Sequence, residues 1–127
     1  MARDYAKELE ARVAFIQGQL RDSGARGIVF GNSGGKDSAL VGILCKKACD
    51  DVLGVMMPCQ SKRNFGEDMQ DGLAVARQFG IETTTVDLSD VKTALTDAIA
   101  PVCTVSDAAS ANIAPRLRMA TLYAIAQ

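Results

Sequence analysis

Apolar residues near the start of the chain recur every three or four positions, whereas those further along form short continuous runs. The recurring set predicts an amphipathic helix with the apolar stripe Tyr5, Leu9, Val13, Ile16 and Leu20. Residues 28–30 and 52–57 are continuous apolar runs, which is typical of strands in a parallel sheet that is buried on both faces. Residues 81–88 predict a third strand because their threonines and valine are β-branched.

Helical patterns separate these predicted strands. They place helices at residues 39–49, 67–79, 91–99 and about 112–125. Gly80 ends the second of these helices, and Ser89 and Asp90 are placed to cap the third. The segment from Pro101 to Ser110 is predicted to be a loop.

Strands that alternate with helices predict an α/β fold, in which a parallel sheet with right-handed crossovers is covered by helices on both faces. Ligands of such sheets bind outside the carboxyl ends of the strands. Residues 31–38 follow the first predicted strand, and residues 59–66 follow the second. We therefore expect these two segments to converge on one crevice.

The turn between the first strand and the next helix carries the richest chemistry, with the residues Gly31, Asn32, Ser33, Gly34, Gly35, Lys36, Asp37 and Ser38. A turn in this place presents backbone N–H groups at a helix N-terminus, where the aligned peptide dipoles favour an anion. Gly34 and Gly35 let the backbone approach phosphates closely, and Ser33 and Ser38 add hydroxyl donors. Asp37 adds a carboxylate suited to Mg²⁺. The turn therefore predicts a nucleotide enzyme.

The Walker A loop does not fit this turn. It needs four residues between its first glycine and a Gly-Lys-Ser/Thr sequence, but three residues separate Gly31 from Gly35. Asp37 also stands where the metal-binding hydroxyl should be. The pattern Ser-Gly-Gly-x-Asp-Ser instead resembles the pyrophosphate loop of the N-type ATP pyrophosphatases, which cleave ATP between its α and β phosphates. The alternative is a glycine turn that merely caps a helix.

The composition narrows the possible functions. The chain has 127 residues, of which 48% are hydrophobic and 23% charged, which suits one globular domain. Its formal net charge is −1 and its basic residues are not clustered, so we expect no nucleic-acid partner. No apolar run approaches the roughly 20 residues of a membrane span, and the N-terminus lacks a signal-peptide core. We therefore expect a cytoplasmic protein with no membrane partner.

The cysteine and histidine content restricts the chemistry further. The chain has four cysteines and no histidine, so the commonest general base and the commonest zinc ligand are missing. Cys45 and Cys49 are spaced as packing residues of one helix in a reducing compartment. Cys59 follows a strand close to the expected nucleotide. A chemical role for Cys59 or Cys103 stays open, because sulfur-transferring pyrophosphatases use cysteines.

A third motif extends the resemblance along the chain. Residues 112–119 have the sequence Asn-Ile-Ala-Pro-Arg-Leu-Arg-Met, after a strand that ends in Met57-Pro58, a polar loop and an acidic helix. Together with the glycine turn, these features resemble the ammonia-dependent NAD synthetases over nearly all 127 residues. The resemblance implies an adenine nucleotide alpha hydrolase-like (Rossmann-like) fold and an NAD synthetase domain at residues 1–127. It also implies that this domain is the N-terminal part of a longer one.

The resemblance implies a reaction in which ATP and Mg²⁺ activate the carboxylate of nicotinic acid adenine dinucleotide (deamido-NAD). Pyrophosphate leaves as the adenylate forms, and ammonia then displaces AMP to give NAD. Adenylyl transfer depends mainly on positioning and charge neutralisation, so it needs no histidine. No glutaminase domain precedes the motifs, and free ammonia is the expected nitrogen source. The family is also typically homodimeric, so we expect a homodimer.

The resemblance also assigns nucleotide contacts. Residues 31–38 would bind the ATP phosphates, although Lys36 occupies the variable position of the motif. Asp37 would ligate Mg²⁺, and the backbone around Met57 would face adenine. Arg63, in the polar loop, is either a triphosphate contact or an exposed loop residue.

The last motif supplies the contacts expected for the second substrate. Arg116 would bind deamido-NAD, because an arginine fork suits its phosphates or carboxylate. Arg118 would either assist or form a salt bridge on the helix surface. The acidic residues at 67, 68 and 71 have two interpretations, a metal cluster or, preferably, acids that complement a helix dipole.

Two alternatives remain open. The first is another ATP pyrophosphatase, either an amidotransferase synthetase or a sulfur-inserting enzyme. The second is a non-catalytic ATP-binding module or fragment, because the chain stops in a helical pattern at Gln127. The second Mg²⁺-binding acid and further substrate contacts of the family are expected beyond this point.

Overall fold

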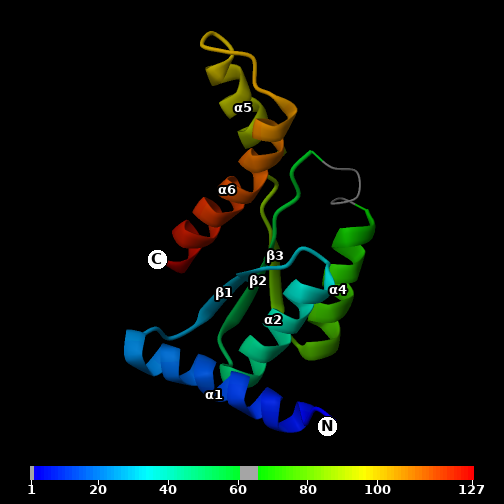
Figure 1. Cartoon of the computed structure of the whole chain (residues 1–127), viewed down its shortest axis with the longest axis vertical. Helices are drawn as coiled ribbons and strands as arrows, with labels where there is room; N and C mark the ends of the chain where they lie inside the picture. The colour runs from blue at the N-terminus through cyan, green and yellow to red at the C-terminus, as the bar shows by residue number, and fades with distance from the viewer. Residues whose placement is uncertain (1, 61–65) are drawn as a thin grey trace.

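Three parallel strands form the centre of the computed structural model, which describes residues 2–60 and 66–127 (Figure 1). They are β1 (Ile28–Gly31), β2 (Val52–Met56) and β3 (Glu82–Thr85), in the spatial order β1-β2-β3. The predicted strands are confirmed, and the third is shorter than predicted. Beyond its end, the N–H of Val86 still donates to the carbonyl of Met56, the last residue of β2, at 2.8 Å, and the N–H of Leu88 donates to the carbonyl of Pro58 at 2.9 Å.

Five described helices connect and flank the strands. They are α1 (Tyr5–Ser23), α2 (Lys36–Ala48), α4 (Glu67–Phe79), α5 (Ser89–Ile99) and α6 (Asp107–Ala126). Gly24 and Gly80 follow α1 and α4 in the left-handed conformation, with φ of 72° and 66°. Glycine is the usual residue for this helix end because it has no Cβ to clash there. None of the described helices combines the length and apolar character needed to span a membrane.

Two predicted helix starts need correction. α6 begins at Asp107, inside the segment predicted to be a loop, and the Ser106 hydroxyl caps it by accepting from the N–H of Ala109 at 3.2 Å. Ser89 does not cap α5 but lies in its first turn, where its N–H donates to the carboxylate of Asp87 at 2.9 Å. Both errors arise because several serines and aspartates in each segment were equally able to cap.

β1 and β2 pack apolar residues on both faces of the sheet, whereas β3 is largely exposed. Phe30 and Val52 pack with Cys45 of α2 and Ala76 of α4 on one side of the sheet. Val55 belongs to a second apolar cluster on the other side, which includes residues of α6. Figure 1 shows α2 and α4 on the side of the sheet away from α6, with α1 packed against α2. Burial on both faces is the reason that β1 and β2 are continuous apolar runs.

Candidate nucleotide-binding site

The glycine turn lies at the carboxyl end of β1 and leads directly into α2. The N–H of Asn32 donates to the carbonyl of Val55 at 2.8 Å, which extends the pairing of β1 with β2 into the turn. Gly35 occupies the N-cap position of α2, and no side chain caps this end of the helix. A helix start without a side-chain cap offers its N–H groups and the positive end of its dipole to an anion.

Backbone N–H groups of the turn converge on side-chain oxygens of the same turn. The N–H of Ser33 donates to the hydroxyl of Ser38, and the N–H of Gly35 donates to the hydroxyl of Ser33. The N–H of Gly34 donates to the side-chain oxygen Oδ1 of Asn32, and each of these three distances is 3.2 Å. The two serine hydroxyls lie 3.0 Å apart. Phosphate oxygens can accept from the N–H groups of Ser33 and Gly35 once the serine side chains rotate, because they are stronger acceptors than hydroxyls.

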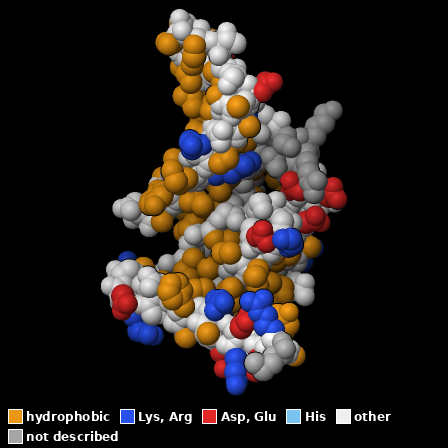
Figure 2. All heavy atoms as spheres, in the orientation of Figure 1, with side chains coloured by type: hydrophobic (Ala, Val, Ile, Leu, Met, Phe, Trp, Pro, Cys, Tyr) orange, Lys and Arg blue, Asp and Glu red, His pale blue; other side chains and the backbone are white. Residues whose placement is uncertain are grey.

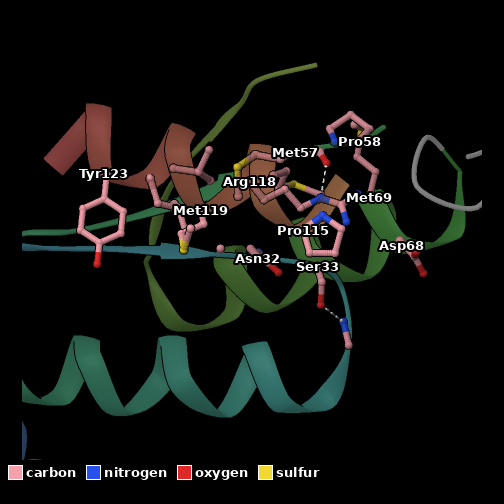
Figure 3. Close-up of a pocket in the computed structure, with 15 residues that line it drawn as sticks. Asn32, Ser33, Met57, Pro58, Asp68, Met69, Pro115, Arg118, Met119 and Tyr123 are labelled. Atoms are coloured by element: carbon pink, nitrogen blue, oxygen red, sulfur yellow. Dashed lines mark hydrogen bonds between the residues drawn. The ribbon is translucent and has the colours of Figure 1, made fainter. Parts of the chain in front are cut away.

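A cavity of about 650 Å³ opens beside the turn (Figure 3). Such a volume is typical of small-molecule sites. Four segments line it: Gly31, Asn32, Ser33 and Gly35 in the turn; Val55, Met56, Met57 and Pro58 along and after β2; Asp68 and Met69 in α4; and Pro115, Arg118, Met119, Leu122 and Tyr123 in α6. A cavity is therefore present where the first two strands end, and the glycine turn lines it. Its expected convergence with residues 59–66 stays a prediction, because residues 61–65 lie outside the described residues.

The two arginines of the last motif lie in different places. The guanidinium Nε of half-buried Arg118 donates to the carbonyl of Met57 at 2.9 Å and lines the cavity. Arg116 is exposed, donates to the carbonyl of Asn112 within α6 at 3.0 Å, and is not among the lining residues. The sequence favoured Arg116 for the substrate, but the structure brings Arg118 to the glycine turn. The substrate role of each remains a prediction.

Asp37 lies in the first turn of α2, outside the cavity lining. Its side chain is 92% exposed, and the ammonium of Lys36 lies 3.0 Å from its carboxylate. No cluster of three or more metal-ligating side chains occurs among the described residues. Proteins usually bind Mg²⁺ through one or two carboxylates together with substrate phosphates. One exposed carboxylate beside a glycine turn that could hold phosphates fits this arrangement.

The apolar wall and the acidic rim of the cavity were not predicted as site features. Met119 and Tyr123 are 55% and 67% exposed, and Figure 2 shows apolar side chains over α6 and acidic ones at the start of α4. Asp68 lines the cavity, although the sequence favoured a dipole role over a metal cluster for the acids of this first helical turn. Its place just after a strand-end loop was the available signal, because such loops border the ligand site.

Comparison with known proteins decides the family. The family model described as NAD synthase matches residues 8–127. The chain belongs to the NAD synthase family. Within it, the NH(3)-dependent NAD(+) synthetase of Finegoldia magna is 39% identical over 125 residues, which cover 98% of this chain and 50% of that protein. This NAD synthase family chain spans about half the length of the curated relatives that it matches.

Solved structures of the family agree with the fold. The NH3-dependent NAD synthetase from Campylobacter jejuni has a TM-score of 0.87 at 31% identity, covering 98% of this chain and 52% of that one. The NMN synthetase from Francisella tularensis has a TM-score of 0.89 at 26% identity, covering 99% and 51%. The predicted Rossmann-like parallel sheet and the resemblance to NAD synthetases are confirmed.

None of the cysteines of this NAD synthase family chain is among the described residues that line the cavity. Cys59 is buried, and its thiol donates to the carbonyl of Leu88 at 3.7 Å. Cys103 is exposed beyond the end of α5. Burial, and secondarily the nearby Cys49, raises the pKa of the Cys45 thiol, which suits a packing role.

Arg63, the possible triphosphate contact in the polar loop, lies outside the described residues.

Proposed function

We propose that this chain supplies the ATP-binding part of a Mg²⁺-dependent ligase that amidates deamido-NAD with ammonia to give NAD, AMP and pyrophosphate. The observation that carries the proposal is the glycine turn, which leads into α2 without a side-chain cap and borders a cavity of about 650 Å³. The match to the NAD synthase family over residues 8–127 supports the choice of reaction.

The proposed nucleotide contacts follow from the geometry of the turn. The N–H groups of Ser33 and Gly35 and the hydroxyls of Ser33 and Ser38 would bind the triphosphate. The apolar wall around Met57 would receive adenine, because a purine face gains from leaving water. When bound through Asp37 and the phosphates, Mg²⁺ would neutralise negative charge at the triphosphate.

The reaction itself would depend on alignment. A carboxylate oxygen of deamido-NAD attacks the α-phosphorus of ATP, the bond from that phosphorus to the bridging oxygen breaks, and pyrophosphate leaves. Ammonia then bonds to the acyl carbon, the bond to AMP breaks, and the nitrogen releases a proton to solvent. Holding the two substrates in line supplies much of the rate enhancement for such transfers. Arg118 is placed beside the turn to hold an anionic group of either substrate.

The assembly and location are part of the same proposal. We propose a homodimer in the cytoplasm, with residues 1–127 in one NAD synthetase domain. Large apolar side chains are exposed on α5 and α6, for example Val91, Leu95 and Tyr123, and they offer a surface for a second subunit. Such exposure on neighbouring elements is common at protein interfaces.

The test is AMP release from Mg·ATP, with deamido-NAD and ammonium added separately and together. We expect AMP release to require deamido-NAD, and NAD to form when ammonium is present. Release with the mononucleotide acid instead would indicate an NMN-forming enzyme, and NAD formation from glutamine alone would contradict the use of free ammonia. If ATP binds but AMP never forms, the chain is a non-catalytic ATP-binding segment.

Replacing Arg118 by alanine is expected to weaken Mg·ATP binding about tenfold. The change removes the cation placed to hold an anionic group, and it removes the hydrogen bond that fixes the Met57 carbonyl at the proposed adenine wall. The matched change Arg116→Ala removes the same side chain two residues away, outside the cavity lining. We expect it to change ATP affinity less than about twofold. Calorimetric titration of both variants with Mg·ATP and with deamido-NAD tests this. If Arg116→Ala weakened ATP binding more than Arg118→Ala did, Arg118 would not be a residue of the nucleotide site.

A further inference from the structure

Asn32 is the one polar or charged residue that is buried within the described part of the chain, with 6% of its surface exposed. Its side chain uses both ends of the amide. The Nδ2 group donates to the carbonyl of Gly72 in α4 at 3.1 Å, and Oδ1 accepts from the N–H of Gly34 at 3.2 Å. Asn32 therefore connects the glycine turn to a helix forty residues further along the chain.

The turn and α4 also meet at a second point. A Cβ on Gly34 would lie 2.2 Å from the backbone oxygen of Asp68, so the turn already touches the first turn of α4. A Cβ on Gly72 would lie 3.0 Å from Oδ1 of Asn32 and 3.0 Å from the terminal methyl of Met56. The two contacts are one helical turn apart on α4, and they hold that helix against the turn.

This arrangement links two walls of the cavity. Gly34 belongs to the turn, whereas Asp68 and Met69 on α4 form the opposite rim. A shift of α4 relative to the turn would move that rim and would also change the direction of the Gly34 N–H. Asn32 is suited to prevent the shift, because a neutral amide donates and accepts at once, while an ionised carboxylate of the same size only accepts.

We infer that Asn32 is a positioning residue that fixes the glycine turn to α4 and so sets the donor geometry of the phosphate site. It acts through Gly34 and the carbonyl of Gly72, not by contact with the nucleotide. The consequence for ATP rests on the proposed function, whereas the connection between the turn and α4 rests on the contacts alone.

The substitution Asn32→Asp tests this inference through pH. When ionised, the new carboxylate faces the Gly72 carbonyl and repels it; when protonated, its O–H donates to that carbonyl and restores both hydrogen bonds. Burial and the Gly72 carbonyl raise the pKa of the new carboxyl. Of the charged groups that line the same cavity, Asp68 on α4 also favours a higher pKa and Arg118 on α6 favours a lower one, while the Lys36–Asp37 pair on α2 is close to neutral.

The measurement is the ratio of variant to wild-type Kd for a non-hydrolysable Mg·ATP analogue, since this ratio cancels the titration of the nucleotide. We expect the variant to bind at least about tenfold more weakly near pH 8 and within about twofold near pH 5. The matched control is Gln78→Glu, which makes the same amide-to-acid change on an exposed position of α4 and should show no such trend. A ratio that does not change with pH would overturn the inference.

Asn32→Leu provides a test that needs no charge. Leucine is similar in size to asparagine but makes neither hydrogen bond. We therefore expect the variant to bind the Mg·ATP analogue at least about tenfold more weakly at every pH. Wild-type affinity in this variant would contradict the inference. If the wild-type chain binds no ATP, the proposed function fails, and hydrogen exchange at the Gly34 amide still decides the connection. The Gly34 amide should exchange faster in Asn32→Leu than in the wild-type chain. Equal exchange rates in the two proteins would refute the connection between the turn and α4.

Discussion

Replacing Asp37 by alanine is expected to lower deamido-NAD-dependent AMP release by about 100-fold or more, because a metal ion on the phosphates contributes several kcal/mol. Asp37 supplies an exposed carboxylate at the glycine turn, and the ammonium of Lys36 lies 3.0 Å from it. The same variant should lose the increase in ATP affinity that Mg²⁺ produces in the wild-type chain. AMP assays and ATP titrations with and without Mg²⁺ measure both effects.

The matched control for this variant is Asp90→Ala. Asp90 is an exposed aspartate in the first turn of α5, so its removal costs the same favourable interaction with a helix dipole, about 0.3–1 kcal/mol. We expect it to leave Mg·ATP binding unchanged. If Asp37→Ala and Asp90→Ala behaved alike in ATP binding and turnover, Asp37 would not be the metal ligand.

Replacing Gly34 by alanine is expected to lower the affinity for Mg·ATP at least about tenfold and to destabilise the fold by about 2 kcal/mol or more. Gly34 has φ of 83°, which is unfavourable for alanine, and the added Cβ would lie 2.2 Å from the backbone oxygen of Asp68. Backbone cannot rotate away as a flexible side chain can. The first turn of α4 must therefore move, and the cavity rim moves with it.

Gly24→Ala separates the clash from the backbone strain. Gly24 also has a positive φ, 72°, but nothing lies within 4 Å of a Cβ placed on it. We expect this variant to cost about 1 kcal/mol and to bind ATP normally. Denaturant unfolding and calorimetry compare the two variants. Equal losses of stability and of ATP affinity in both would show that the contact with Asp68 does not matter.

Local signals were sufficient for much of the fold. Gly24 and Gly80 end helices because a left-handed residue without a Cβ is a local requirement, independent of the rest of the chain. The apolar runs at β1 and β2 indicated burial on both faces, and the structure places Phe30 and Val55 in clusters on opposite sides. The glycine turn was recognised for the same reason, since adjacent residues in the chain supply its donors.

The site was predicted less completely, and α6 shows why. Its apolar residues are spread around the helix, so the pattern does not reveal which side meets the sheet. Arg116 and Arg118 are two residues apart and therefore point to widely different directions around the axis. Packing of Leu117 and Leu122 against the sheet turns Arg118 toward the carbonyl of Met57 and leaves Arg116 exposed.

By itself, the sequence determined the order of strands and helices, the glycine turn after the first strand and the resemblance to NAD synthetases, because each depends on neighbouring residues or on a motif. Only the tertiary structure decided that Asn32 holds α4, that Asp68 borders the cavity, and that Arg118 faces it. These contacts join residues 40 and 61 positions apart, as in Asn32 with Gly72 and Met57 with Arg118. Such pairs form when helices pack on the sheet, and packing is a property of the whole chain.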